Sequence, residues 1–121
     1  MSTKFAITVA ASFLLNSIAT AAEIRSVPRI LDGDTVEIAE QRIRIFGIDA
    51  PETEQLCLDA AGQRSSCGVS ARNALSSLGA GQPWSCTTVD LDPYGRHVAR
   101  CQVTGQDVGR WMVAQGWALA F

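Results

Sequence analysis

The chain has almost no lysine. Lys4 is the only one among the 121 residues, so every other basic residue is an arginine. Twelve acidic residues outnumber the ten basic ones, and the formal net charge is −2. Proteins that hold nucleic acid without sequence preference use a broad surface of Lys and Arg that displaces counterions from the phosphates. The composition excludes such a surface, so any phosphate binding must be concentrated in a few arginines or in a metal.

The sequence also lacks an apolar run long enough to anchor it in a membrane. The run from Phe5 to Ile18 contains polar residues near its end and is shorter than the roughly 20 residues that a transmembrane helix needs. Lys4 precedes the run and small residues follow it, which is the form of a secretory signal peptide. We expect cleavage after Ala21, so that residues 1–21 are a signal peptide. Residues 22–121 would then be exported, to the periplasm or the medium, as a monomeric domain without a membrane anchor.

Internal repeats, low-complexity tracts and linkers are absent, which favours one domain. Isoleucines and valines alternate with polar residues on both sides of a short polar break, a pattern typical of a β-hairpin. In the second strand the isoleucines would face the core and the arginines the other side. The expected elements are, in order, a strand over 24–30, a hairpin over 36–45, a helix ending before Gly79, a hairpin over 84–103 and a short helix over 108–115.

This order of elements differs from the alternating strands and helices of a parallel α/β sheet. It predicts a mainly β, α+β domain, a five-stranded OB-fold barrel. One helix lies between strands 3 and 4, and a short helix lies near the C-terminus.

The four cysteines show no C-x-x-C spacing, which argues against zinc, and their even number in an exported chain indicates disulfides. Free thiols or a zinc site remain the alternative. The segment Asp92–Gly95 fits a type I turn, with Asp, Pro and Gly at their preferred positions. Such a turn places Cys86 opposite Cys101 and leaves Cys57 to close a short loop with Cys67. A β-bulge would shift this register by one residue.

Three short polar clusters lie at turns or strand ends. Taken singly, each has a plain structural explanation as a turn, a strand end or a hairpin tip, and that explanation is the favoured one. The clusters are residues 32–35, residues 44–52 and residues 94–96.

Together the clusters contain the groups that phosphodiester hydrolysis requires. A hard cation needs oxygen ligands, which the carboxylates of Asp34 and Asp49 and the backbone carbonyl of Ala50 can supply. Glu52 is spaced to act as a general base on the attacking water.

The arginines of the clusters complete the set. Arg44 and Arg96 can form forked hydrogen bonds to a phosphate and stabilise the additional negative charge of its transition state. His97, the only histidine, is interpreted as a surface residue. The three tryptophans are assigned to the core rather than to base stacking.

The segments Ile30–Val36, Arg44–Thr53 and Asp92–Arg96 resemble successive signature segments of the staphylococcal-nuclease-like (thermonuclease) family. The tail Val113–Ala118 is similar to the step that precedes that family's C-terminal helix. The resemblance covers roughly residues 24–121, in the same order and with similar gaps. Here the chain stops inside an apolar run, and we expect it to be shortened at its C-terminus.

The resemblance implies a calcium-dependent endonuclease that cuts DNA and RNA in single-stranded or frayed regions and leaves 3′-phosphate ends. It implies that Asp34, Asp49 and the Ala50 carbonyl bind Ca²⁺. The catalytic residues that it implies are Arg44, Glu52 and Arg96, and Tyr94 lies against the nucleotide.

Two positions depart from the family pattern. Ala50 stands where threonine is frequent, and Pro93 replaces a frequent lysine, which removes one phosphate contact. The main alternative to the enzyme is a catalytically inactive OB-fold module that binds single-stranded nucleic acid or another ligand. A third hypothesis is a disulfide-stabilised interaction domain without any role in nucleic-acid binding. We disfavour it because the three polar clusters would then occur together by coincidence.

Overall fold

A computed structural model describes residues 3–12 and 23–121 of the chain. The predicted signal peptide, residues 1–21, falls partly outside these ranges, and its described part contains neither helix nor strand. None of the helices in the described part is long and apolar enough to cross a membrane.

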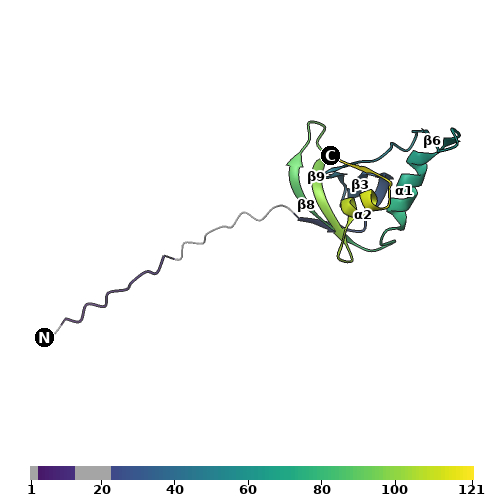
Figure 1. Cartoon of the computed structure of the whole chain (residues 1–121). Helices are drawn as coiled ribbons and strands as arrows, with labels where there is room; N and C mark the ends of the chain where they lie inside the picture. The colour runs from purple at the N-terminus through teal and green to yellow at the C-terminus, as the bar shows by residue number, and fades with distance from the viewer. Residues whose placement is uncertain (1–2, 13–22) are drawn as a thin grey trace.

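A mixed sheet of seven strands curls around one core. Its main path runs in the order β1-β8-β9-β4-β3-β2, and β10 pairs with β9. β1 and β2 lie at opposite ends of this path, yet only Val27 and Pro28 separate them in the chain. The sheet therefore curves back on itself, as Figure 1 shows, and the predicted OB-like α+β fold is confirmed.

The strands of this sheet are short, and most pairs are antiparallel. The exception is the parallel pair β4–β9, in which Ile43 lies beside His97. The strand bounds are β1 Glu23–Ser26, β2 Arg29–Asp32, β3 Thr35–Ile38, β4 Gln41–Ile45, β8 Trp84–Leu91, β9 His97–Val103 and β10 Gln106–Asp107.

The alternation that predicted the first hairpin matches the burial of its side chains. Ile43 is fully buried and Ile45 is 1 % exposed, whereas Arg42, which directly precedes Ile43, is exposed. β3 and β4 are joined by Ala39 and Glu40, both with positive φ, as a two-residue hairpin turn requires. The isoleucines therefore enter the core and the arginines point away from it.

Two helices pack against the barrel. α1 (Cys67–Ser77) contacts β2, and α2 (Val108–Ala114) contacts β9. α1 begins earlier than its apolar spacing indicated, since the first apolar residue of that spacing is Ala71. Of the three tryptophans, Trp84 is buried and Trp111 packs against the core, but Trp117 is 36 % exposed, so its assignment to the core was wrong.

Five two-residue strands, β10 among them, escaped prediction because segments so short show no periodicity. β5 (Ile48–Asp49) pairs with β11 (Leu119–Ala120), and β6 (Cys57–Leu58) pairs with β7 (Arg64–Ser65). The first of these pairs places the C-terminal segment directly beside Asp49.

Both predicted disulfides are present: Cys57–Cys67 and Cys86–Cys101. The expected register of the second hairpin holds at Cys86 and Cys101 only because two irregularities cancel. The tip has one extra residue on the β9 side, where Gly95 has a φ of 79°. A bulge between Thr88 and Asp90 adds one residue on the β8 side.

Candidate active site

Asp34 anchors the candidate site from inside the protein. It lies in the turn between β2 and β3 and is 8 % exposed. One carboxylate oxygen accepts a hydrogen bond from the backbone N–H of Ala50 at 2.9 Å, and the other accepts one from the Thr35 hydroxyl at 2.9 Å. Asp34 thereby fixes the loop after β5 against the start of β3.

Arg44 joins the two predicted metal-binding acids. Its Nη1 lies 3.0 Å from Asp34 Oδ2 and donates to the Ile48 carbonyl at 3.0 Å, while its Nη2 lies 3.6 Å from Asp49 Oδ1. The Arg44 side chain is only 19 % exposed. Two carboxylates with one guanidinium leave a local excess of one negative charge, which favours a cation beside them.

Asp49 and Glu52 face solvent. The Asp49 side chain is 67 % exposed, and Glu52 is exposed as well. Asp49, Ala50 and Glu52 line a cleft of about 460 Å³ together with Trp117 and Leu119. Glu52, the predicted base, thus lines the same cleft as Asp49 and Ala50, two of the predicted metal-binding residues.

A second cleft opens on the other side of Asp49. It measures about 390 Å³ and is lined by Arg44, Asp49 and the C-terminal residues Leu119 to Phe121. Asp49 and Leu119 therefore border both clefts, because β11 runs beside β5.

Arg96 and Tyr94 belong to the tip of the β8–β9 hairpin. Asp92 accepts hydrogen bonds from the backbone N–H groups of Tyr94 and Arg96, both at 2.9 Å, and from the Arg96 side chain. Burial raises the pKa of Asp92, but these hydrogen bonds and the positive charge of Arg96 outweigh it and hold that pKa below its ordinary value. The side chain that orients Arg96 is therefore an ionised carboxylate, that of Asp92, at neutral pH.

The Tyr94 ring is 86 % exposed and lies 5.9 Å from the Arg96 guanidinium carbon. In the described part of the chain, no ion pair or hydrogen bond joins Arg96 or Tyr94 to the acids of the site. The parallel register places the start of β9 beside β4, on which Arg44 lies.

One polar pair of the site was not singled out from the sequence. The carboxylate of Asp32 accepts hydrogen bonds from both the backbone N–H and the hydroxyl of Thr53, and that hydroxyl also lies 3.1 Å from the Leu31 carbonyl. These bonds tie the residue after Glu52 to the end of β2. The sequence signal for this pair was the threonine directly after Glu52, a residue that can donate a hydrogen bond to a carboxylate.

The donor set fits a hard cation. Among residues 3–12 and 23–121, no group of three or more His, Cys, Asp and Glu side chains could hold a metal. The predicted set, however, has two carboxylates and one carbonyl. A carboxylate offers about four lone-pair positions, and Asp34 uses three of them on Thr35, Ala50 and Arg44, which leaves room for one ligand bond.

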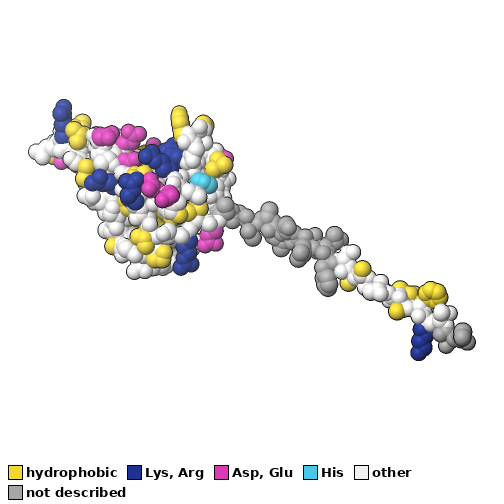
Figure 2. Space-filling view, turned by 180° about the vertical axis from the view of Figure 1, so that it is seen from behind, with side chains coloured by type: hydrophobic (Ala, Val, Ile, Leu, Met, Phe, Trp, Pro, Cys, Tyr) yellow, Lys and Arg dark blue, Asp and Glu magenta, His cyan; other side chains and the backbone are white. Residues whose placement is uncertain are grey.

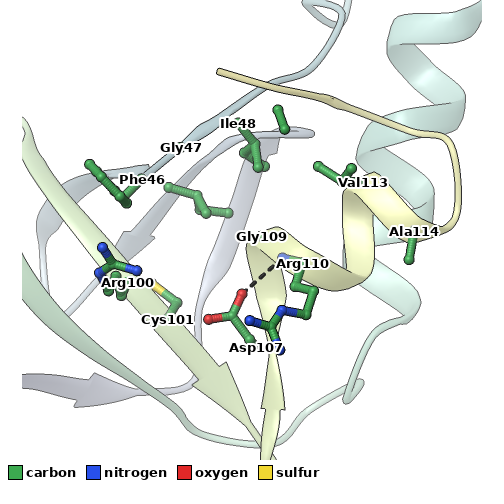
Figure 3. A pocket seen from close by; sticks show the side chains of 12 residues that line it. Phe46, Gly47, Ile48, Arg100, Cys101, Asp107, Gly109, Arg110, Val113 and Ala114 are labelled. Carbon is green, nitrogen blue, oxygen red and sulfur yellow. Dashed lines mark hydrogen bonds between the residues drawn. The ribbon is translucent and has the colours of Figure 1, made fainter.

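A further cavity of about 400 Å³ lies between α2 and the end of β4, away from the polar set (Figure 3). Its floor is apolar, with Ile48 and Val113, and Arg100 and Arg110 stand at its sides. It contains none of the predicted catalytic or metal-binding residues, and it is slightly smaller than the cleft that Asp49 and Glu52 line.

Comparison with known proteins agrees with the predicted fold family. Residues 42–121 match the family described as staphylococcal nuclease homologue. The chain is 40 % identical to the succinoglycan biosynthesis protein ExoI of Rhizobium meliloti (strain 1021), over 92 % of this chain and 60 % of that protein. It is 33 % identical to an uncharacterized endonuclease of Escherichia coli O157:H7, over 78 % of this chain and 59 % of that protein.

A micrococcal nuclease of Shigella flexneri is 34 % identical over 93 % of this chain and 67 % of that protein. The chain thus spans about 60 % of the length of the first two relatives. The family match extends over more than half of the chain and includes Arg44, Asp49, Glu52 and Arg96. The chain therefore belongs to the staphylococcal nuclease family.

Proposed function

We propose that this protein is an exported, calcium-dependent nuclease that hydrolyses phosphodiester bonds of DNA and RNA. The observation that carries the proposal is the arrangement around Asp49. Arg44 contacts both Asp34 and Asp49, and Glu52 opens into the same cleft as Asp49. Membership of the family supports the same activity.

Glu52 accepts a proton from the attacking water, and the water oxygen forms a bond to phosphorus as the bond to the leaving sugar oxygen breaks. Exposure of Glu52 in the cleft gives that water access to its carboxylate. By the resemblance, the 5′-oxygen leaves and the phosphate stays on the 3′ end.

Arg44 and Arg96 stabilise the charge that the phosphate gains in the transition state. Arg44 lies on β4, and Arg96 directly precedes β9, which pairs with β4, so in this proposal the two arginines bind different oxygens of one phosphate. Asp34, Asp49 and the Ala50 carbonyl would hold Ca²⁺, which neutralises phosphate charge when it is bound. Tyr94, exposed beside Arg96, lies against the nucleotide in this proposal.

Export is supported by the two disulfides, which persist in oxidising compartments such as the periplasm or the medium. By the resemblance, the substrate is single-stranded or frayed DNA and RNA.

The test measures release of acid-soluble nucleotides from denatured DNA, with calcium and with chelator, for wild type and Glu52→Gln. Loss of the general base should lower the rate by about 10²–10⁴-fold while the melting temperature stays unchanged, because Glu52 is exposed. Glu54→Gln, a change of the same kind at a neighbouring exposed residue, is the matched control and should retain activity. A folded wild type that releases nothing would point instead to an inactive OB-fold module that binds nucleic acid.

A further inference from the structure

The two disulfides differ in their access to solvent. Cys86 and Cys101 are 0 % and 1 % exposed in the middle of the sheet. Cys57 and Cys67 are half-buried; Cys57 lies between two exposed residues, and Cys67 follows the exposed loop of residues 58–66. A thiolate must reach a sulfur atom before it can break a disulfide, so a reductant reaches the Cys57–Cys67 bond first.

The accessible disulfide belongs to the segment that supports Glu52. Cys67 is the first residue of α1, and the next residue, Gly68, donates its N–H to the Gln55 carbonyl at 3.2 Å. Gln55 in turn donates its N–H to the Glu52 carbonyl at 2.8 Å. A hydrogen-bonded path thus leads from the start of α1 to the backbone of the proposed base.

The contact between Gly68 and Glu52 is close as well. A Cβ atom on Gly68 would lie 1.6 Å from the Glu52 carbonyl oxygen, so the backbones touch without any side chain between them. Any shift of the first turn of α1 would therefore be transmitted to Glu52.

Little else holds the loop in between. Its only strands, β6 and β7, are two residues long, and the side chains of residues 58–66 are exposed. Segments with few buried contacts open at a low free-energy cost. The Cys57–Cys67 bond is thus the main tie between this loop and α1.

We propose that the Cys57–Cys67 disulfide positions Glu52, so that its reduction lowers turnover while the barrel stays folded. The inference rests on the proposed function of Glu52. A dithiol reductant supplies two electrons and two protons. The bond between the two sulfur atoms breaks, Cys57 and Cys67 become thiols, and the dithiol is oxidised to its own disulfide.

The experiment treats the native protein with dithiothreitol, alkylates the free thiols, maps them by mass spectrometry and measures kcat and KM on single-stranded DNA. We expect alkylation at Cys57 and Cys67 alone and a fall in kcat of about tenfold or more, with KM little changed, because misplacement of a catalytic group costs rate rather than binding. Reoxidation of a reduced sample that has not been alkylated should restore kcat. The Cys57→Ser/Cys67→Ser variant should have the low kcat from the start and should not respond to the reductant.

Hydrogen exchange gives a second readout that does not depend on activity. Reduction should accelerate exchange in residues 53–66 and leave β8 and β9 unchanged. An unchanged kcat after selective reduction would overturn the proposal, as would alkylation of Cys86 and Cys101 at the same dithiothreitol concentration. An oxidised, folded protein without any activity would count against the nuclease function instead, and unchanged exchange in residues 53–66 would still refute the positioning role.

Discussion

At the scale of single residues, the two acids that contact Arg44 differ in environment. Asp34 is buried and accepts three hydrogen bonds or ion contacts, from Thr35, Ala50 and Arg44. Asp49 is mostly exposed and has one long contact to Arg44. We therefore expect the carboxylate of Asp34 to stabilise the fold and that of Asp49 to contribute almost nothing to stability.

This contrast predicts different costs for the same substitution. Asp34→Asn should lower the free energy of unfolding by about 1–3 kcal/mol, because it leaves a partly buried guanidinium without its counter-charge. Asp49→Asn should change it by less than about 0.5 kcal/mol. Both variants should lose calcium-dependent release of nucleotides. Urea unfolding and the release assay check the two halves of the prediction, and equal destabilisation by both changes would contradict it.

At the scale of elements, the β8–β9 hairpin carries Arg96, one of the two proposed phosphate-binding arginines, on a tip that is stabilised locally. Asp92 donates its N–H to the Arg96 carbonyl at 3.0 Å and accepts the Gly95 N–H at 3.2 Å through its own carbonyl. Its carboxylate accepts hydrogen bonds from the backbone N–H groups of Tyr94 and Arg96 and from the guanidinium of Arg96. The geometry of Arg96 therefore depends on one carboxylate being ionised.

The lowered pKa of Asp92 predicts a pH dependence of stability. In the unfolded chain the carboxyl titrates near its ordinary value of 3.8, and in the folded protein it titrates below that value. Its contribution to stability is therefore fully present above the ordinary pKa and is lost as the pH falls through the folded pKa. The difference in free energy of unfolding between wild type and Asp92→Asn should be constant above about pH 5 and should shrink towards about pH 2.

Urea titrations across this pH range measure that difference. Glu54→Gln, which removes an exposed carboxylate, controls for the change in net charge. A difference that grows as the pH falls would have the wrong sign and would refute the role of Asp92.

At the scale of the whole molecule, charge is mixed rather than segregated. Figure 2 shows basic and acidic side chains interspersed on the face in view. The composition, with ten basic and twelve acidic residues, leads to the same expectation. The protein should therefore depend on a few phosphate contacts rather than on long-range attraction.

A quantitative expectation follows for binding. If Arg44 and Arg96 make the two phosphate contacts, the logarithm of the association constant should fall with the logarithm of salt concentration with a slope of about −1.4. Fluorescence anisotropy of labelled single-stranded DNA with the Glu52→Gln variant measures the slope without cleavage. Adding Arg96→Gln should reduce it by about half, whereas Arg64→Gln should leave it unchanged. A slope of about −4 or steeper would indicate an extended basic surface.

The sequence predicted those parts of the fold that have a period or a turn signature. Ile43 and Ile45 are buried as their alternation indicated. Cys86 faces Cys101, as the turn signature indicated, because the extra residue at Gly95 and the bulge after Thr88 offset each other. An alternating pattern of side chains indicates which face of the sheet a residue occupies, but it does not reveal a β-bulge, in which one residue is left unpaired.

For the site, the sequence predicted Asp34 and Asp49 as metal ligands and Arg44 as a catalytic residue. The structure places these three side chains in contact, and their roles stay predictions. The sequence did not reveal the bonds between Asp32 and Thr53, because hydrogen bonds between distant loops leave no periodic trace. The roles of Glu52 and of the other catalytic residues stay predictions.

The parallel pairing of β4 with β9 has a consequence for folding. Ile43 and His97 are far apart in the sequence, so this pair closes a long loop, and contacts of that kind form slowly. Arg44 lies on one of these strands and Arg96 directly before the other. The two proposed catalytic arginines are therefore not aligned in a newly synthesised chain until the sheet has closed.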